Sequence, residues 1–156
     1  MKLAEALALR ADAARRVEQL RARIVANARF QEGEEPAEDA QALLAEVNGV
    51  LDELETLIRR INRTNAASDL GAEGTITDAL ARRDVLRTRH AVVTAAADAA
   101  AGKSGVGMGR QLRSELKILA ALPVAQLRAR ADALAQQIRE LDVRVQRANW
   151  EFDLLE

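Results

Sequence analysis

The sequence predicts an all-α protein in which long antiparallel helices form a coiled-coil-like hairpin or a four-helix bundle. Two observations support this class. The 156-residue chain has 33 alanines but only three aromatic residues and two prolines, a composition biased toward strong helix formers. Its apolar residues also recur at alternating steps of three and four, the spacing of one helix face. A chain of this length suits one domain, so we expect residues 1–156 to form a single helical domain.

The clearest helical pattern lies at residues 36–63. Its apolar residues repeat over three heptads and predict a coiled-coil seam. The residues of this seam are Ala40, Leu44, Val47, Leu51, Leu54, Ile58 and Ile61. Leu43, Val50 and Leu57 repeat every seven residues beside it, so the helix is expected to contact more than one neighbour. Pro36 suits the first helical turn, where its missing N–H costs nothing.

Three further helices are expected at residues 2–29, 77–100 and 123–149. The last has a regular seam of Val124, Leu127, Ala131, Leu134, Ile138, Leu141, Val145 and Ala148. Thr77 is the expected N-cap of the helix at 77–100. The apolar side of that helix consists of Leu80, Leu86, Val92, Val93, Ala96 and Ala97.

Charge and composition argue against several classes of protein. A formal net charge of −1 gives no strong attraction to nucleic acid or to an anionic membrane. The lack of cysteine excludes disulfides and thiolate metal sites, and it fits a reducing compartment. The chain has no signal-peptide pattern and no run of about 18 apolar residues, so we expect a cytoplasmic protein. Because many seam residues are alanine, the core of one bundle would be thin, and we expect a homo-oligomer.

The stretch AAAGKSGVGMGR, residues 99–110, contains a Gly-Lys-Ser triplet that resembles part of a phosphate-binding loop. Such a loop needs a glycine at the position of Ala97 and a preceding β-strand, but an alanine-rich helix precedes it here. We therefore interpret the glycines as a helix end and a flexible connection. The pattern at residues 112–122 leaves open whether this segment is helical or extended.

No cofactor, metal ion or catalytic residue is predicted. His90 is the only histidine, and the Glu-x-x-His pattern of di-iron bundles would require glutamate at the position of Arg87. The acidic stretch at residues 32–39 lacks the alternating oxygen ligands of a calcium loop, and an acidic helix start explains it.

Residues 59–87 contain the polar residues that we select as a candidate interaction surface. They are Arg59, Asn62, Arg63, Asn65, Asp78, Arg82, Arg83 and Asp84. One interpretation is that they line a polar pocket or a subunit contact. The other is structural, because Asn62, Thr64 and Asn65 are residue types that form turns and helix caps.

Several segments outside the seams resemble a family of small bacterial helical proteins known as septicolysin or septicolysin-like. They are MKLAEAL at the start, QEGEEPAED at 31–39, INRTN at 61–65, TDALARRDVLR at 77–87 and ELDVRVQRANWEFDLLE at the end. This resemblance spans essentially the whole chain and implies a helical hairpin or bundle. It brings no catalytic residues with it.

Three hypotheses on function follow. The first is a non-enzymatic, self-associating helical module with a structural or protein-interaction role, because the heptad seams come without a catalytic constellation. The second is a helical accessory module that binds RNA or phosphate through its arginines. The third is a membrane-active, cytolysin-like protein, which only the septicolysin name implies.

Overall fold

The computed structural model describes residues 1–103 and 116–156. These residues contain four α-helices, α1 (Leu3–Asn27), α2 (Ala40–Ala67), α3 (Ile76–Ala100) and α4 (Val124–Glu151), and one short 3-10 helix, η1 (Gly71–Glu73). The described part of the chain has isolated β-bridges but no β-strand. The predicted all-α class is therefore confirmed.

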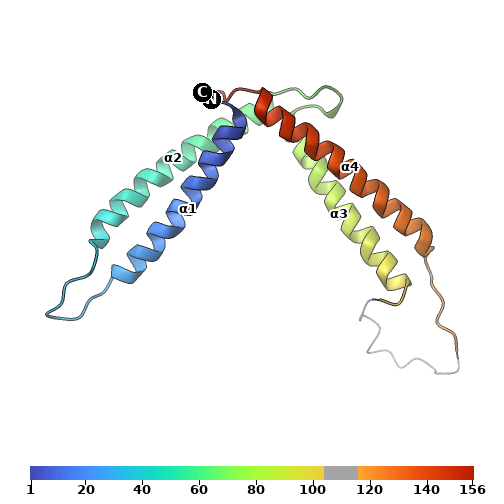
Figure 1. The fold of residues 1–156 in the computed structure, drawn as a ribbon, viewed down its shortest axis with the longest axis horizontal. Coiled ribbons are helices and arrows are strands. Elements are labelled where there is room, and N and C mark those ends of the chain that lie inside the picture. Colours follow the sequence, from blue (N-terminus) through green and yellow to red (C-terminus); the bar gives the residue numbers. More distant parts are fainter. Residues whose placement is uncertain (104–115) are drawn as a thin grey trace. The chain divides into compact units, whose positions relative to one another are not determined.

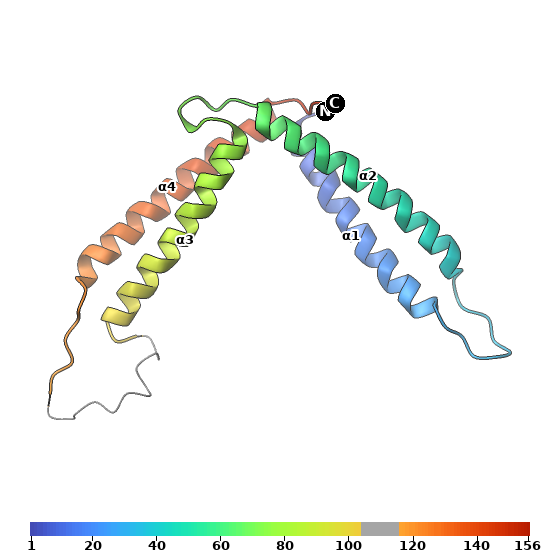
Figure 2. The ribbon, with the colours of Figure 1, turned by 180° about the vertical axis from the view of Figure 1, so that it is seen from behind.

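The chain divides into two compact units. The first unit consists of residues 1–77 and 146–156, and the second unit consists of residues 78–145. In the first unit α1 and α2 lie side by side and antiparallel, and in the second unit α3 and α4 do the same (Figures 1 and 2). Each unit is thus built on an antiparallel helical pair, as the hairpin prediction requires.

Helix α2 begins and ends four residues later than the sequence predicted. Its N-cap is Asp39, whose carboxylate accepts the backbone N–H groups of Gln41 at 2.9 Å and Ala42 at 3.2 Å. Pro36 therefore precedes the helix, and its predicted place in the first turn is wrong. At the other end, the INRTN segment is helical rather than a turn, because Ile61 and Thr64 continue the buried stripe of the helix.

The glycine at the end of α3 adopts the predicted role. Gly102 has a φ of 77°, which glycine adopts without strain. Its N–H donates to the carbonyl of Ala99 at 3.0 Å, and the N–H of Lys103 donates to the carbonyl of Asp98 at 2.9 Å. This is the Schellman arrangement that ends a helix, and it explains the first glycine of the AAAGKSGVGMGR stretch. Residues 104–115, with the other glycines, lie outside the described residues.

The other predictions for this part of the chain have mixed outcomes. Helix α3 begins at Ile76, so Thr75 and not Thr77 occupies the N-cap position. Of the segment at 112–122, which the sequence left open, residues 116–122 are described and are not helical.

The core of the first unit lies between α1 and α2. Buried residues from both helices pack together there, namely Leu20, Leu43, Val47 and Val50, and Ala13, Val17 and Ile24 pack against them. The predicted seam of α2 is wrong at every seventh residue. Leu44, Leu51 and Ile58 are 44%, 42% and 38% exposed, because the side of α2 that faces α1 is centred on Leu43 and Val50.

In the second unit the α4 seam is confirmed at its centre, where Ala131, Leu134, Leu141 and Val145 are buried. The apolar side predicted for α3 is correct at its buried residues Leu86, Val93 and Ala97, but Val92 is 64% exposed. The buried stripe of α3 follows a path that the sequence did not predict. It steps by three and four through Ala79, Arg83, Leu86, His90, Val93 and Ala97, with the two polar residues half-buried.

The two ends of the chain meet in the first unit. The backbone N–H of Leu3 donates to the carbonyl of Phe152 at 3.0 Å, and that of Leu154 donates to the carbonyl of Met1 at 2.8 Å. An ion pair of 3.0 Å joins Lys2 to Asp153. These contacts hold the C-terminal tail, residues 152–156, against the start of α1.

Candidate interaction surfaces

Three apolar side chains form an exposed line along α2, which we call the outer line of α2: Leu44, Leu51 and Ile58. Each residue follows a member of the stripe that faces α1 by one position. Because one residue turns an α-helix by about 100°, the outer line lies to one side of the contact between α1 and α2. The first unit thus exposes a second row of apolar residues at heptad spacing.

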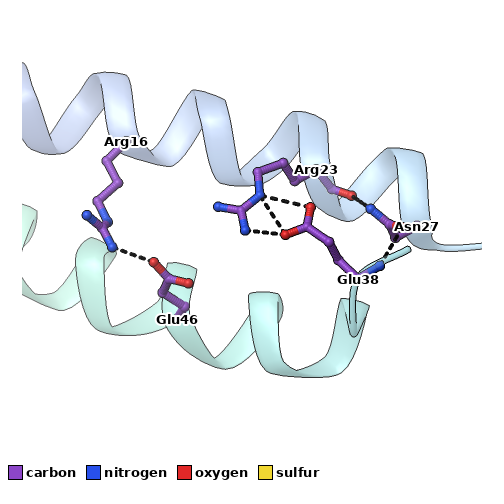
Figure 3. Close-up of polar contacts among 5 residues, drawn as sticks. All are labelled: Arg16, Arg23, Asn27, Glu38 and Glu46. Atoms are coloured by element: carbon purple, nitrogen blue, oxygen red, sulfur yellow. Dashed lines mark hydrogen bonds and ion pairs between the residues drawn. The ribbon is translucent and has the colours of Figure 1, made fainter. Parts of the chain in front are cut away.

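The other edge of the α1–α2 pair is polar and joined by ion pairs (Figure 3). Arg16 of α1 contacts Glu46 of α2 with 2.5 Å between Nη2 and Oε1. Arg23 donates to both carboxylate oxygens of Glu38, just before α2, including Nε bonds of 3.0 and 3.1 Å. Asn27 accepts the backbone N–H of Glu38 at 3.0 Å. Side chains of the first unit therefore join the two helices along this edge.

The Arg23–Glu38 contact shifts the pKa of both side chains. The hydrogen bond with Arg23 lowers the pKa of the Glu38 carboxyl below its usual value, because it stabilises the charged form. The same bond raises the pKa of the Arg23 guanidinium. Both groups stay charged at neutral pH, so the contact acts as a charge-assisted clamp between the end of α1 and the start of α2.

The same edge carries an open groove of about 760 Å³ between α1 and α2. Its apolar lining comes from Leu9 and Ala13 of α1 and from Val50 and Leu57 of α2. Charged and polar residues complete the lining, and they are Asp12, Arg15, Arg16, Gln19, Asp52, Glu53 and Thr56.

In the second unit, ion pairs connect α3 to α4. Arg83 and Arg87 both approach the carboxylate of Asp142, at 3.5 Å and 3.3 Å. One end of the pair is joined by Arg128 and Asp98, with 2.5 Å between Nη2 and Oδ1. These arginines are engaged with carboxylates rather than forming an open basic patch.

A second exposed line lies on α3. Val85 and Val92 are 58% and 64% exposed and lie seven residues apart, and we call them the outer line of α3. Arg82 and Arg89 each precede one of them by three residues and are also exposed. The outer line of α3 therefore combines apolar side chains with arginines.

Four of the residues selected from the sequence belong to the first unit, on α2. Arg59 pairs with Glu55 one turn earlier at 3.4 Å. Arg63 donates to the carbonyl oxygen of Glu156 at 3.2 Å. Asn62 is exposed and Asn65 is half-buried. Of these four, Arg63 is the residue that contacts the C-terminal tail.

The other four selected residues belong to the second unit, on α3. Asp78, Arg82 and Asp84 are exposed, and Arg83 is half-buried. Arg83 lies 3.6 Å from Asp84, its neighbour in sequence, and 3.5 Å from Asp142 of α4. The structure thus brings Arg83 and Asp84 together and adds Asp142 to them, a residue that the sequence did not select.

The sequence interpretation missed the role of Thr64 and Arg60 in holding the C-terminal tail. Thr64 is fully buried, and its hydroxyl donates to the Arg60 carbonyl at 2.8 Å and accepts the Leu155 N–H at 3.0 Å. The Arg60 side chain donates to the Leu155 carbonyl at 2.9 Å. The signal was present in the spacing, because Thr64 follows Leu57 and Ile61 at steps of four and three.

The described residues include no group of three or more histidine, aspartate or glutamate side chains placed to hold a metal ion. None of the helices in the described ranges has the length and apolar character needed to cross a membrane.

Comparisons with known proteins place this fold in a family. Residues 10–154 match the model of a family of unknown function, DUF6847, and the chain belongs to this family. A crystal structure of a functionally unknown conserved protein from Corynebacterium diphtheriae is similar over 99% of both chains, with 37% sequence identity and a TM-score of 0.87. No curated protein matches the chain. Neither the family nor the similar crystal structure carries the septicolysin name that the sequence resemblance suggested.

Proposed function

We propose that this protein is a non-enzymatic helical module that self-associates through the outer line of α2. The observation that carries the proposal is the exposure of Leu44, Leu51 and Ile58 at heptad spacing on a helix whose neighbouring stripe already packs on α1. A row of this kind is the pattern with which one helix packs against another. Burying the exposed part of each of these side chains would contribute roughly 1 kcal/mol to the free energy of association.

The ion-paired edge of the α1–α2 pair is a poorer candidate for this contact than the outer line of α2. There, Arg16 and Arg23 form ion pairs with Glu46 and Glu38, so the polar groups on this edge have partners within the unit. Beside the outer line of α2, the Glu55–Arg59 pair lies within α2 and joins no second helix. The apolar edge is therefore the better docking surface.

The test is the mass of the purified protein in solution by light scattering, before and after Leu51→Glu. We expect the wild type to exceed the 17.0 kDa of one chain and the variant to approach it, because a buried carboxylate opposes assembly. Leu9→Glu is the matched control, since Leu9 is similarly exposed at 47% but lines the groove on the other edge. A wild type of one-chain mass, or a variant that assembles like the wild type, would contradict the proposal.

A second candidate function is contact with RNA or another phosphate polymer, and the charge of the second unit favours it. Residues 78–145 contain 12 basic and 7 acidic side chains. This candidate predicts binding of a short labelled single-stranded RNA that weakens steeply as salt rises. Failure to bind at low ionic strength would eliminate it. The engagement of Arg83, Arg87 and Arg128 with carboxylates makes this the weaker candidate.

A further inference from the structure

The net charge of −1 conceals an uneven distribution between the two units. The first unit contains 17 acidic and 11 basic side chains, a formal charge of −6, whereas the second contains 12 basic and 7 acidic side chains, a formal charge of +5. Opposite net charges attract over distances of about 10 Å at moderate ionic strength. The first unit of one molecule is therefore attractive to the second unit of another.

The exposed apolar lines follow the same division. The outer line of α2 repeats every seven residues, and so does the outer line of α3. Beside the first line, Glu55 pairs with Arg59 within α2. Arg82 and Arg89 flank the second line, and Asp78 lies seven residues before Val85. The two lines therefore match in spacing, and the units that carry them have net charges of opposite sign.

We propose that the outer line of α2 in one copy packs against the outer line of α3 in a second copy. This inference rests on the proposed function and names the partner of that same surface. Pairing α2 with α2 would bring together two first units of formal charge −6, and pairing α3 with α3 would bring together two second units of formal charge +5. Pairing α2 of one copy with α3 of another avoids both.

Cross-linking between single cysteines tests this pairing without background, because the chain has no cysteine of its own. Asn48→Cys introduces a thiol between Leu44 and Leu51, and Ala81→Cys introduces one a turn before Val85, both at exposed positions. The two purified variants are treated with a flexible bismaleimide, separately and as an equimolar mixture. We expect the mixture to give a covalent dimer of one Asn48→Cys chain and one Ala81→Cys chain, identified by intact mass, and each variant alone to give several-fold less dimer.

A control variant and the alternative outcomes keep the test decisive. Ala22→Cys is exposed on α1, two residues beyond the buried Leu20 and hence on the side away from α2, and it should not cross-link with either variant. Dimers formed by Asn48→Cys alone would show α2–α2 pairing, which overturns this inference but leaves the proposed function intact. An assembled protein that gives no mixed dimer would also overturn it. A wild type of one-chain mass by light scattering would remove the proposed function itself.

Discussion

The two units differ in how they accommodate a polar side chain on the buried stripe of a helix. In the first unit, Thr64 of α2 is fully buried, and its hydroxyl both donates and accepts a hydrogen bond. In the second unit, Arg83 and His90 occupy stripe positions of α3. The Nε of Arg83 is buried without a hydrogen-bond partner in the described part of the chain, and its ion pairs are 3.5 and 3.6 Å long.

The Thr64 hydroxyl is expected to stabilise the first unit, whereas the Arg83 and His90 side chains are expected to destabilise the second. A buried hydroxyl with both partners adds specificity, because the bond from the Leu155 N–H forms only when the C-terminal tail is in place. A half-buried cation with long contacts loses hydration without full compensation. Polar residues on the stripe should therefore stabilise the first unit and destabilise the second, and substitutions can test each half of this statement.

The largest effect is expected from Thr64→Val, which keeps the shape of the side chain but removes the acceptor for the Leu155 N–H. The Leu155 N–H would lose its partner in a part-buried hydrogen bond, which costs about 1–2 kcal/mol, so the free energy of unfolding should fall by that amount. Chemical denaturation followed by circular dichroism measures it. Thr56→Val is the matched control, because the exposed Thr56 hydroxyl also donates one turn back, to Asp52 at 3.0 Å, but holds no tail. Equal losses in both variants would refute the role of the tail contact.

His90→Leu should act in the opposite direction. His90 lies between Leu86 and Val93 on the stripe, is half-buried and makes no hydrogen bond to the described residues. An apolar side chain of similar size should raise the free energy of unfolding by about 1 kcal/mol through added burial. Thermal unfolding measures the gain, and Thr88→Leu at an exposed position of α3 serves as the comparison. A loss of stability on His90→Leu would show that the imidazole has a structural partner.

The helical class could be predicted from the sequence because it depends on local properties. Alanine content and apolar spacing are sufficient to place helices, and the α4 seam was correct because one apolar row dominates it. Two apolar rows run along α2, one through Leu43 and one through Leu44. Spacing alone does not tell which row faces α1, because that depends on the partner helix.

The candidate surfaces were harder to predict because their contacts join residues far apart in the chain. Arg63 was selected from its local context, yet its partner is Glu156, and Asp142 was not selected although it binds Arg83. Apolar spacing did not predict the stripe through Arg83 and His90, because these two residues are polar. Leu44, by contrast, was predicted in the seam but is exposed, and it belongs to the outer line of α2, which we propose as a docking surface.

The smallest effect concerns the ion-paired edge of the first unit, where Glu38→Gln removes one partner of Arg23. The folded-state pKa of Glu38 lies below the usual value of about 4.5, so its contribution to stability is present above that pH and is lost as the pH falls through the lowered pKa. The variant should therefore be slightly less stable than the wild type at neutral pH, and the difference should vanish in acid. Urea denaturation at several pH values between neutral and about 3 measures this difference in stability.

Glu55→Gln is the control for this prediction, since the ion pair of Glu55 with Arg59 lies within α2 and does not connect two elements. A gap between wild type and Glu38→Gln that persists in acid would mean that the side chain of Glu38 acts through packing and not through its charge.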